Sequence, residues 1–386
     1  MIRAKPQSAS PVSTGNHFLS NEDFMNNTIK SLAAAIALLS PLAGHAGPAL
    51  YRETAYTLSN TAINTVLAFR LNAAGNMQPA GSYATGGSGT GAGLGNQGAL
   101  AFSENQRYLF AINAGSNDVS VFRVRDNGLE LVDRAAEPGL TPVSLTVAHD
   151  RVYVVNAGDD SIFGYRFDAR SGRLYPLEQS YRKLGDEASG PAQISFDRDG
   201  DALVVTEKAG NKIVSFTLDN RGLPDQKHSV ASAGNTPFGF AFGKRNQFFV
   251  SEAQGGAANG ATVSAYRLDE DGSVQLLDGA VAVDQTAACW LATSPNGKLA
   301  FTANTPAGSI AAFAIGRHGE LELLQARAAE ESRPNDLAVS DDGRHLYTLS
   351  NGDHSIGVYR IGRSGELERL TRLTTLPAGV TGLVLR

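Results

Sequence analysis

The sequence predicts an all-β protein built from repeated four-stranded units, and three observations support this prediction. A segment of about 45 residues recurs along almost the whole chain. Each copy opens on an apolar strand and crosses a polar turn into a hydrophobic strand that ends in Asn or Glu. A third, alternating strand follows, then a Gly-containing turn and a weaker fourth strand. Four short strands at this spacing are typical of the blades of a β-propeller.

Six complete repeats can be followed in order along the chain. Their first strands are expected at 98–102, 141–145, 190–194, 236–240, 286–290 and 333–337. Their second strands are expected to end at Asn113, Asn156, Glu207, Glu252, Asn304 and Asn351. Alternating third strands are clearest at 119–124 and 356–361.

The two ends of the repeated region predict a seventh blade. Residues 55–60 and 65–70 have the pattern of second and third strands without a first strand before them. Residues 379–385 have the pattern of a first strand with nothing after it. Pairing these segments would close the ring and protect two sheet edges. We therefore predict a single seven-bladed β-propeller domain over 47–386, with the last strand completing blade one.

The glycine-rich run 86–95 is predicted to connect blades one and two flexibly. No Lys-Ser or Lys-Thr pair follows the run, which argues against a phosphate-binding loop.

Charge and cysteine content argue against a nucleic-acid partner and against a disulfide. The net charge is −5, and no Lys/Arg cluster is dense enough to indicate nucleic-acid binding. Cys289 is the only cysteine, so no internal disulfide is possible. We expect a monomer.

The N-terminus predicts a leader over 1–46. Residues 25–46 combine a short positively charged start, an apolar run and the small-residue sequence Gly-His-Ala, which is typical of a secretory signal. The apolar run is too short for a stable membrane span. Residues 1–24 fit no signal pattern, so we expect Met25 to be the true start and the mature chain to be periplasmic or secreted. The alternative is a disordered extension before a membrane-anchoring helix.

In a propeller, the starts of the first strands and the ends of the second strands lie on one face, at the mouth of the axial channel. The second strands would place there Asn60, Asn113, Asn156, Glu207, Glu252, Asn304 and Asn351. The first strands would add Gln193, Phe238, Cys289, Trp290, Asn335 and Asp336. Such a set is suited to a divalent cation, to acid–base chemistry or to a polar ligand. Alternatively, the recurring Asn caps a turn in each repeat.

Glu207 and Glu252 are the catalytic candidates because they replace Asn in adjacent blades. Two neighbouring carboxylates raise the pKa of one of them, which suits acid–base work. Alternatively they are surface groups, with Lys208 as the partner of Glu207. Trp290 either stacks on a ring-shaped ligand or plugs the space between blades. Cys289 is interpreted as a buried, inert thiol.

The repeat resembles a known family. Residues 141–148 with 152–156, and 346–351 with 355–359, resemble the seven-bladed lactonase propellers, which include 6-phosphogluconolactonase and carboxymuconate-lactonizing enzymes. The resemblance extends over about 51–386 and implies chemistry on a lactone or carbohydrate-like small molecule. It also implies a catalytic His and Arg near the openings of two successive first strands and a Glu at the end of a second strand.

This chain departs from that catalytic pattern. Residues 236–239 replace the Arg and the His that follows it, the other His position falls near Ala192, and Glu252 is retained. We expect Glu252 to act as acid or base with Glu207 as its partner, and Arg333 to substitute in part for the lost cation. The expected ligand-binding residues are Gln193, Phe238, Trp290, Asn304, Arg333 and Asp336.

Two further readings remain open from the sequence. In the first, a divalent cation held by Glu207, Glu252 and nearby amides polarises the carbonyl of the substrate. In the second, the chain is a non-catalytic exported propeller that binds a protein or a small ligand, with 254–260 as its recognition loop.

Overall fold

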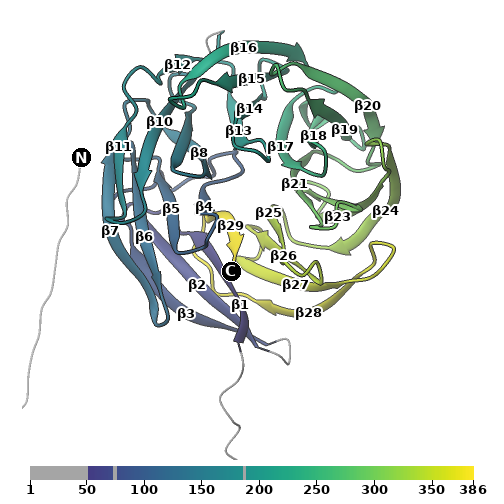
Figure 1. Ribbon diagram of the computed structural model, residues 1–386. Helices are drawn as coiled ribbons and strands as arrows, with labels where there is room; N and C mark the ends of the chain where they lie inside the picture. The colour runs from purple at the N-terminus through teal and green to yellow at the C-terminus, as the bar shows by residue number, and fades with distance from the viewer. Residues whose placement is uncertain (1–50, 73–75, 186–187) are drawn as a thin grey trace, which may run out of the picture. The chain divides into compact units, whose positions relative to one another are not determined.

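The computed structural model describes residues 51–72, 76–185 and 188–386. Residues Pro48–Arg386 form one compact unit, whereas the predicted leader, including the signal at 25–46, lies outside the described residues. Seven antiparallel sheets surround a central axis (Figure 1). The prediction of an all-β, seven-bladed propeller is therefore confirmed.

The strands follow the predicted order from the axis outward. Blade one contains β29 (Thr381–Leu385), β1 (Tyr51–Leu58), β2 (Thr65–Asn72) and β3 (Met77–Ala84). Blade two contains β4 (Leu100–Phe102), β5 (Tyr108–Asn113), β6 (Asp118–Arg125) and β7 (Gly128–Ala136). Blade three contains β8 (Pro142–Ala148), β9 (Arg151–Asn156), β10 (Ser161–Asp168), β11 (Arg173–Pro176) and β12 (Arg182–Lys183), of which the last two both pair with β10.

The other four blades have four strands each. Blade four contains β13 (Pro191–Phe196), β14 (Ala202–Glu207), β15 (Lys212–Leu218) and β16 (Pro224–Ala231). Blade five contains β17 (Pro237–Phe242), β18 (Gln247–Glu252), β19 (Thr262–Leu268) and β20 (Val274–Ala282), with the short helix η1 (Gln254–Gly256) after β18. Blade six contains β21 (Ala288–Thr293), β22 (Leu299–Asn304), β23 (Ser309–Ile315) and β24 (Leu321–Glu330). Blade seven contains β25 (Pro334–Val339), β26 (His345–Ser350), β27 (Ser355–Ile361) and β28 (Leu367–Leu373).

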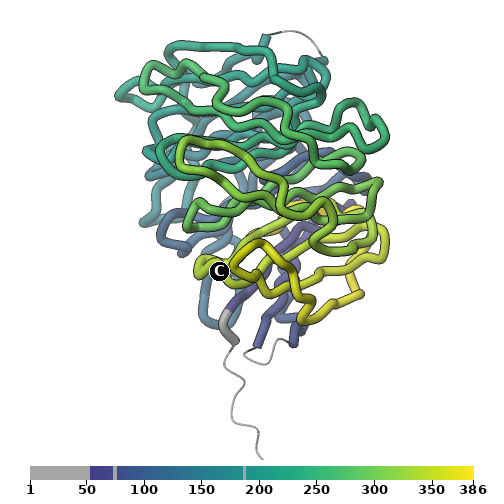
Figure 2. The backbone as a smooth tube through the Cα atoms, turned by 90° about the vertical axis from the view of Figure 1, so that its right-hand side faces the viewer, coloured from purple at the N-terminus to yellow at the C-terminus, as the bar shows by residue number. Residues whose placement is uncertain are grey.

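The C-terminal strand closes the ring, as predicted. β29 pairs antiparallel with β1, with Ala55 opposite Leu385 and Leu58 opposite Thr381. The hydroxyl of Thr57 also donates to the carbonyl of Thr381 at 3.3 Å. Figure 2 shows the purple first blade and the yellow C-terminal segment together at one side of the ring. This pairing removes the exposed edge that each end would otherwise present.

Burial explains why the strands differ in character. The second strands are buried along their whole length, as in β5, β14, β18 and β22, because neighbouring blades cover both of their faces. The outer strand β16 is mostly exposed, and its second half alternates between partly buried and exposed positions, because its outer side meets water. In the part of the chain that the structure describes, no helix is long and apolar enough to cross a membrane.

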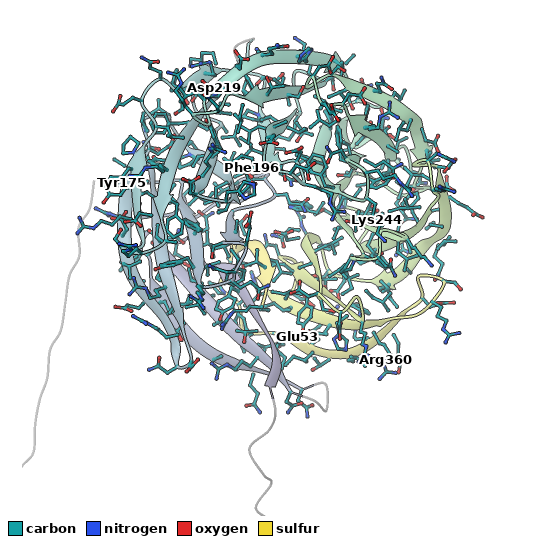
Figure 3. All side chains as sticks on the ribbon, viewed as in Figure 1. Glu53, Tyr175, Phe196, Asp219, Lys244 and Arg360 are labelled. Atoms are coloured by element: carbon teal, nitrogen blue, oxygen red, sulfur yellow. The ribbon has the colours of Figure 1, made fainter. Side chains whose placement is uncertain are left out.

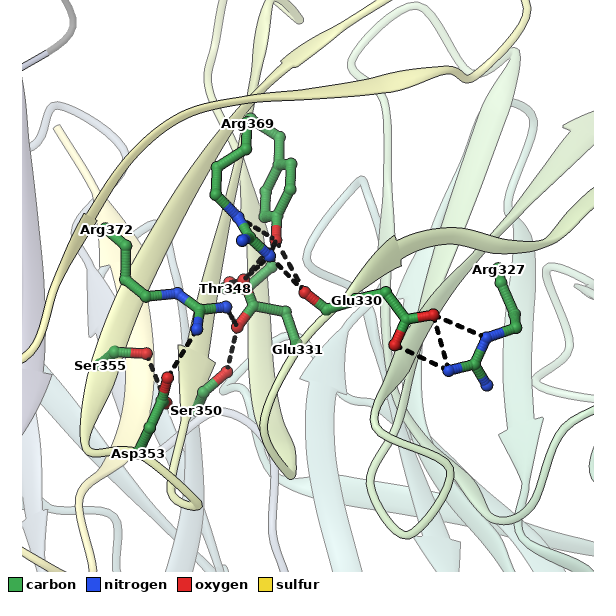
Figure 4. Close-up of polar contacts among 10 residues, drawn as sticks. Arg327, Glu330, Glu331, Thr348, Ser350, Asp353, Ser355, Arg369 and Arg372 are labelled. Carbon is green, nitrogen blue, oxygen red and sulfur yellow. Dashed lines mark hydrogen bonds and ion pairs between the residues drawn. The ribbon is translucent and has the colours of Figure 1, made fainter.

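Polar side chains are buried in the seams between blades. In the seam between blades six and seven, the Glu331 carboxylate accepts hydrogen bonds from Thr348 at 3.1 Å and Ser350 at 2.9 Å, and pairs with Arg372 at 2.5 Å (Figure 4). Glu137 occupies the equivalent place between blades two and three, where Asn156 and Tyr165 donate to it. Burial raises the pKa of Glu137 to about 7.

Candidate functional site

Glu252 lies in such a seam, between blades four and five. Its side chain is fully buried at the end of β18. The carboxylate accepts hydrogen bonds from the hydroxyls of Ser232 at 3.0 Å, Ser264 at 2.7 Å and Thr262 at 2.5 Å, and from the backbone N–H of Gly234 at 2.9 Å. These contacts join the end of blade four to β18 and β19. The carboxylate is thus surrounded by donors of the protein itself.

Other second-strand ends are also buried and bonded to the protein itself. Asn113 donates to Asp118 at 2.6 Å and Ser120 at 2.8 Å, and Asn304 donates to Ser309 at 3.2 Å. Glu207 is buried, and a Cβ added to Gly210 would lie 2.7 Å from its Oε2 atom. The structure therefore buries Glu207, Glu252 and Asn304 in three different blades, and the hydrogen bonds of Glu252 and Asn304 are made within or next to their own blades.

Two residues of the connection between blades one and two cross the axial channel. The side chain of Asn96 donates to the carbonyl of Val143 in blade three and accepts from Thr381 in blade one at 2.8 Å. The side chain of Gln97 bonds both backbone groups of Leu291 in blade six, at 2.8 and 3.1 Å. We call Asn96 and Gln97 the axial plug. The glycine-rich connection is thus fixed at its end to several blades.

The first-strand candidates surround this plug. Gln193 bonds the backbone N–H and C=O of Phe240 at 2.8 and 2.9 Å and so joins blades four and five. Asp336 is buried and accepts from the backbone N–H of Leu337 at 2.8 Å. Burial raises the pKa of Asp336 to about 8, so its carboxyl group is mostly protonated at neutral pH.

Two aromatic side chains form an apolar wall beside the plug. The rings of Phe238 and Trp290 lie 4.9 Å apart between centroids, and both side chains are buried. The indole Nε1–H of Trp290 donates to the carbonyl of Asn96 at 2.7 Å. Cys289 lies next to this wall, and burial raises its pKa to about 12. Its thiol is therefore un-ionised at neutral pH, in agreement with an inert role.

Lys208 is a further candidate, which the sequence analysis considered only as a partner of Glu207. Its Nζ atom lies 5.0 Å from the centroid of the Phe238 ring and donates to the carbonyl of Gly95, just before the plug. Burial lowers its pKa to about 8, so it is mostly a cation at neutral pH. A signal was present in the sequence, because the residue after the second-strand end is small in the other blades, either Ala, Thr or Gly.

Arg333 lies on the same face as Lys208, in the turn before β25. Its side chain is exposed and its backbone has a positive φ of 51°. It is therefore available to solvent, whereas Lys208 is held at the axis.

We call one group of residues the mouth cluster: Lys208, Phe238, Trp290 and the axial plug. This cluster combines a cation with an apolar wall. Its cation can stabilise negative charge on a carbonyl oxygen, and the low dielectric of its surroundings strengthens that interaction. Its aromatic wall can pack against a small ring.

Comparisons with known proteins agree with this architecture. The family model described as "Lactonase, 7-bladed beta-propeller" matches residues 51–185, 179–285 and 248–331. No curated protein matches the chain.

Solved structures share the fold at low sequence identity. The periplasmic gluconolactonase PpgL of Pseudomonas aeruginosa is 16% identical, with a TM-score of 0.71, and the match covers 87% of this chain and 98% of that one. A Bacteroides fragilis protein is 17% identical, with a TM-score of 0.70, and the match covers 86% of this chain and 98% of that one. At this identity the structures establish the fold, and the family model establishes the family. The chain therefore belongs to the lactonase family of seven-bladed β-propellers.

Proposed function

We propose that this protein is an exported enzyme that opens or closes a lactone-type ring at the mouth of the axial channel, with Lys208 as its catalytic cation. The position of Lys208 supports the proposal most strongly. It supplies a partly buried positive charge beside Phe238, on the face where the family pattern expects an Arg and a His. The family supports the class of reaction.

The proposed reaction develops charge where the Lys208 ammonium group can act. In hydrolysis, water attacks the carbonyl carbon and the carbonyl oxygen becomes negative. The ring C–O bond then breaks, and the leaving oxygen takes a proton to give the hydroxy acid. The ammonium group of Lys208 would donate to the carbonyl oxygen in place of its present contact with Gly95. Because its pKa is lowered to about 8, this donor would be lost as the pH rises above that value.

Glu252 has a different expected role in this proposal. To act as an acid, a base or a cation ligand, its carboxylate must break hydrogen bonds with several donors in its own seam. We propose that it supports the fold of blade five, which positions Phe238. The catalytic role expected from the sequence for Glu252 and Glu207 remains a prediction, as does a divalent cation on them.

Turnover of a panel of lactones tests the proposal. We expect Lys208→Met to lower kcat/KM at least about 100-fold, since removal of one oxyanion donor typically costs this much. Lys244→Met is the matched control, because Lys244 is exposed away from the mouth cluster, and it should keep full activity. Assays of Glu252→Gln, with and without Ca²⁺, test the catalytic role and the cation site that the sequence predicts for Glu252. Equal rates for Lys208→Met and wild type would contradict the proposal, and no turnover by folded wild type would favour a binding propeller.

Export rests on the signal at 25–46, which lies outside the described residues. N-terminal sequencing of the mature protein from the periplasmic or secreted fraction should start at Gly47. A chain that stays in the cytoplasm with residues 25–46 attached would contradict export.

A further inference from the structure

A cleft of about 580 Å³ opens where blades seven and one meet, on the face opposite the mouth cluster. We call it the junction cleft. Its walls come from β1, from the turn between β25 and β26, from the end of β27 and from the C-terminus, and include Glu53, Asp342, Arg344, His345, Arg360 and Arg386. Figure 3 shows Glu53 and Arg360 in this part of the ring.

Three side chains in this cleft have the chemistry of metal ligands and lie close together. One ligand atom from each of Glu53, Asp342 and His345 lies within 4.8 Å of the others. The His345 Nδ1 and Glu53 Oε1 atoms are 3.3 Å apart. Two ligands of a tetrahedral Zn²⁺ ion, each about 2.1 Å from the metal, are about 3.4 Å apart. In this structure the two groups contact each other directly, and the same separation fits two ligands of one ion.

Outer contacts hold these ligands in place. The hydroxyl of Tyr347, which is buried in β26, donates to the Oε2 atom of Glu53. The Oδ1 atom of Asp342 accepts from the hydroxyl of Ser340 at 2.7 Å and from the backbone N–H of Arg344 at 2.9 Å. Such contacts orient metal ligands and are typical of true metal sites.

The ligand set also has an open side. The side chains of His345 and Glu53 are 23% and 14% exposed, and that of Asp342 is 47% exposed, so all three are reachable from the cleft. Three protein ligands with open positions toward a cleft are typical of a metal ion that binds a further ligand. Arg386 lines the same cleft, and its charge would attract an anion to those positions. Arg344 also lines the cleft, and its Nε atom lies 3.6 Å from the Oδ2 atom of Asp342, so a bound ion would compete with this ion pair.

We propose that Glu53, Asp342 and His345 bind one divalent transition-metal ion, whose remaining positions face the junction cleft and accept water or a small anion. One His nitrogen with two carboxylate oxygens suits Zn²⁺ or Mn²⁺. The site joins the first and last blades, so the bound ion would also link the two segments that close the ring. It is independent of the proposed chemistry at the mouth cluster.

Equilibrium dialysis of the untagged full chain against Zn²⁺, and separately Mn²⁺, tests the site. We expect one ion per wild-type chain, with affinity at least about tenfold weaker in His345→Ala and Asp342→Asn, because even outer-shell contacts are typically worth about 10–100-fold. Tyr347→Phe removes only the contact to Glu53 and should weaken binding by about tenfold.

The matched control is His149→Ala. His149 forms a similar pair with Glu104 at 3.1 Å, and both side chains are more than half exposed. This variant should bind like wild type. Replacing the metal by Co²⁺ should give visible absorption bands that the His345→Ala variant lacks. The proposal is overturned if folded wild type binds no ion, or if His345→Ala and Asp342→Asn bind as tightly as wild type.

Discussion

At the scale of single residues, burial rather than contact between charges is the main cause of the shifted pKa values. Asp336 and Glu137 are carboxyl groups whose pKa is raised by burial, and Lys208 is an amine whose pKa is lowered by the same cause. Each shift changes folding stability with pH, because the folded and unfolded chains then bind different numbers of protons.

Asp336→Asn should remove the contribution of Asp336 to the pH dependence of folding stability. The unfolded carboxyl group loses its proton near its ordinary pKa of 3.8, whereas the folded group keeps it to about pH 8. Stability of the wild type therefore falls as the pH rises through this window, by up to about 1.4 kcal/mol per pH unit. Urea unfolding from pH 5 to 8 should show a shallower fall for the variant. Parallel curves for the two proteins would refute this account of Asp336.

Glu252→Ala should destabilise blade five by at least about 3 kcal/mol, because several buried hydroxyls and a backbone N–H lose their acceptor. Glu252→Gln keeps the shape and one acceptor oxygen and should cost less. Glu322→Ala, at an exposed position in β24, serves as the control in the same unfolding experiment. A cost for Glu252→Ala no larger than that of the control would argue against a seam role.

At the scale of elements, the connection between β3 and β4 has the least expected structure. The sequence predicts a flexible link over 86–95, and the two residues that follow it, Asn96 and Gln97, are bonded to blades one, three and six. These partners are distant in the sequence and include backbone groups, so no side-chain pattern could reveal them. The side chain of Gln97 also lies against Gly239, where a Cβ atom would be 1.9 Å from Gln97 Oε1.

Gly239→Ala should therefore displace the axial plug. We expect a loss of stability of about 1–3 kcal/mol, typical of overpacking, together with a change in Trp290 emission. Gly93→Ala lies in the same connection, where a Cβ atom meets nothing within 4 Å, and should behave like wild type. Equal melting temperatures for the two variants would show that the plug does not pack tightly against blade five.

The same scale explains how far the site was predictable. The repeat identified the ends of the second strands, but side chains of a strand alternate between its two sides. The Thr206 hydroxyl donates to the carbonyl of Phe238, Glu207 is buried beside Gly210, and Lys208 lies against the Phe238 ring. The proposed cation, Lys208, therefore lies one residue beyond Glu207, the carboxylate that the sequence analysis selected, and on the other side of the strand. Similarly, Glu53 and His345 are 292 residues apart, so only ring closure brings them together.

At the scale of the whole molecule, the fold was predictable because the same four-strand pattern recurs in every repeat. Ring closure has a direct test, since blade one takes its first strand from the far end of the chain. A chain ending at residue 377 should lose cooperative unfolding and aggregate through the exposed edge of β1. Adding a peptide of residues 378–386 should restore the native circular dichroism spectrum. A truncated chain that unfolds like wild type without the peptide would contradict this role of β29.

The central claim is that a small ring binds at the mouth cluster beside Lys208, and Trp290 reports on it directly because it is the only tryptophan of the chain. The decisive measurement is the fluorescence of Trp290 during titration with lactams, which imitate lactones but resist hydrolysis. We expect a saturable change in wild type and in Lys244→Met that is lost in Lys208→Met. If no lactam changes the emission, or if Lys208→Met responds as wild type does, the assignment of the functional site to the mouth cluster is wrong.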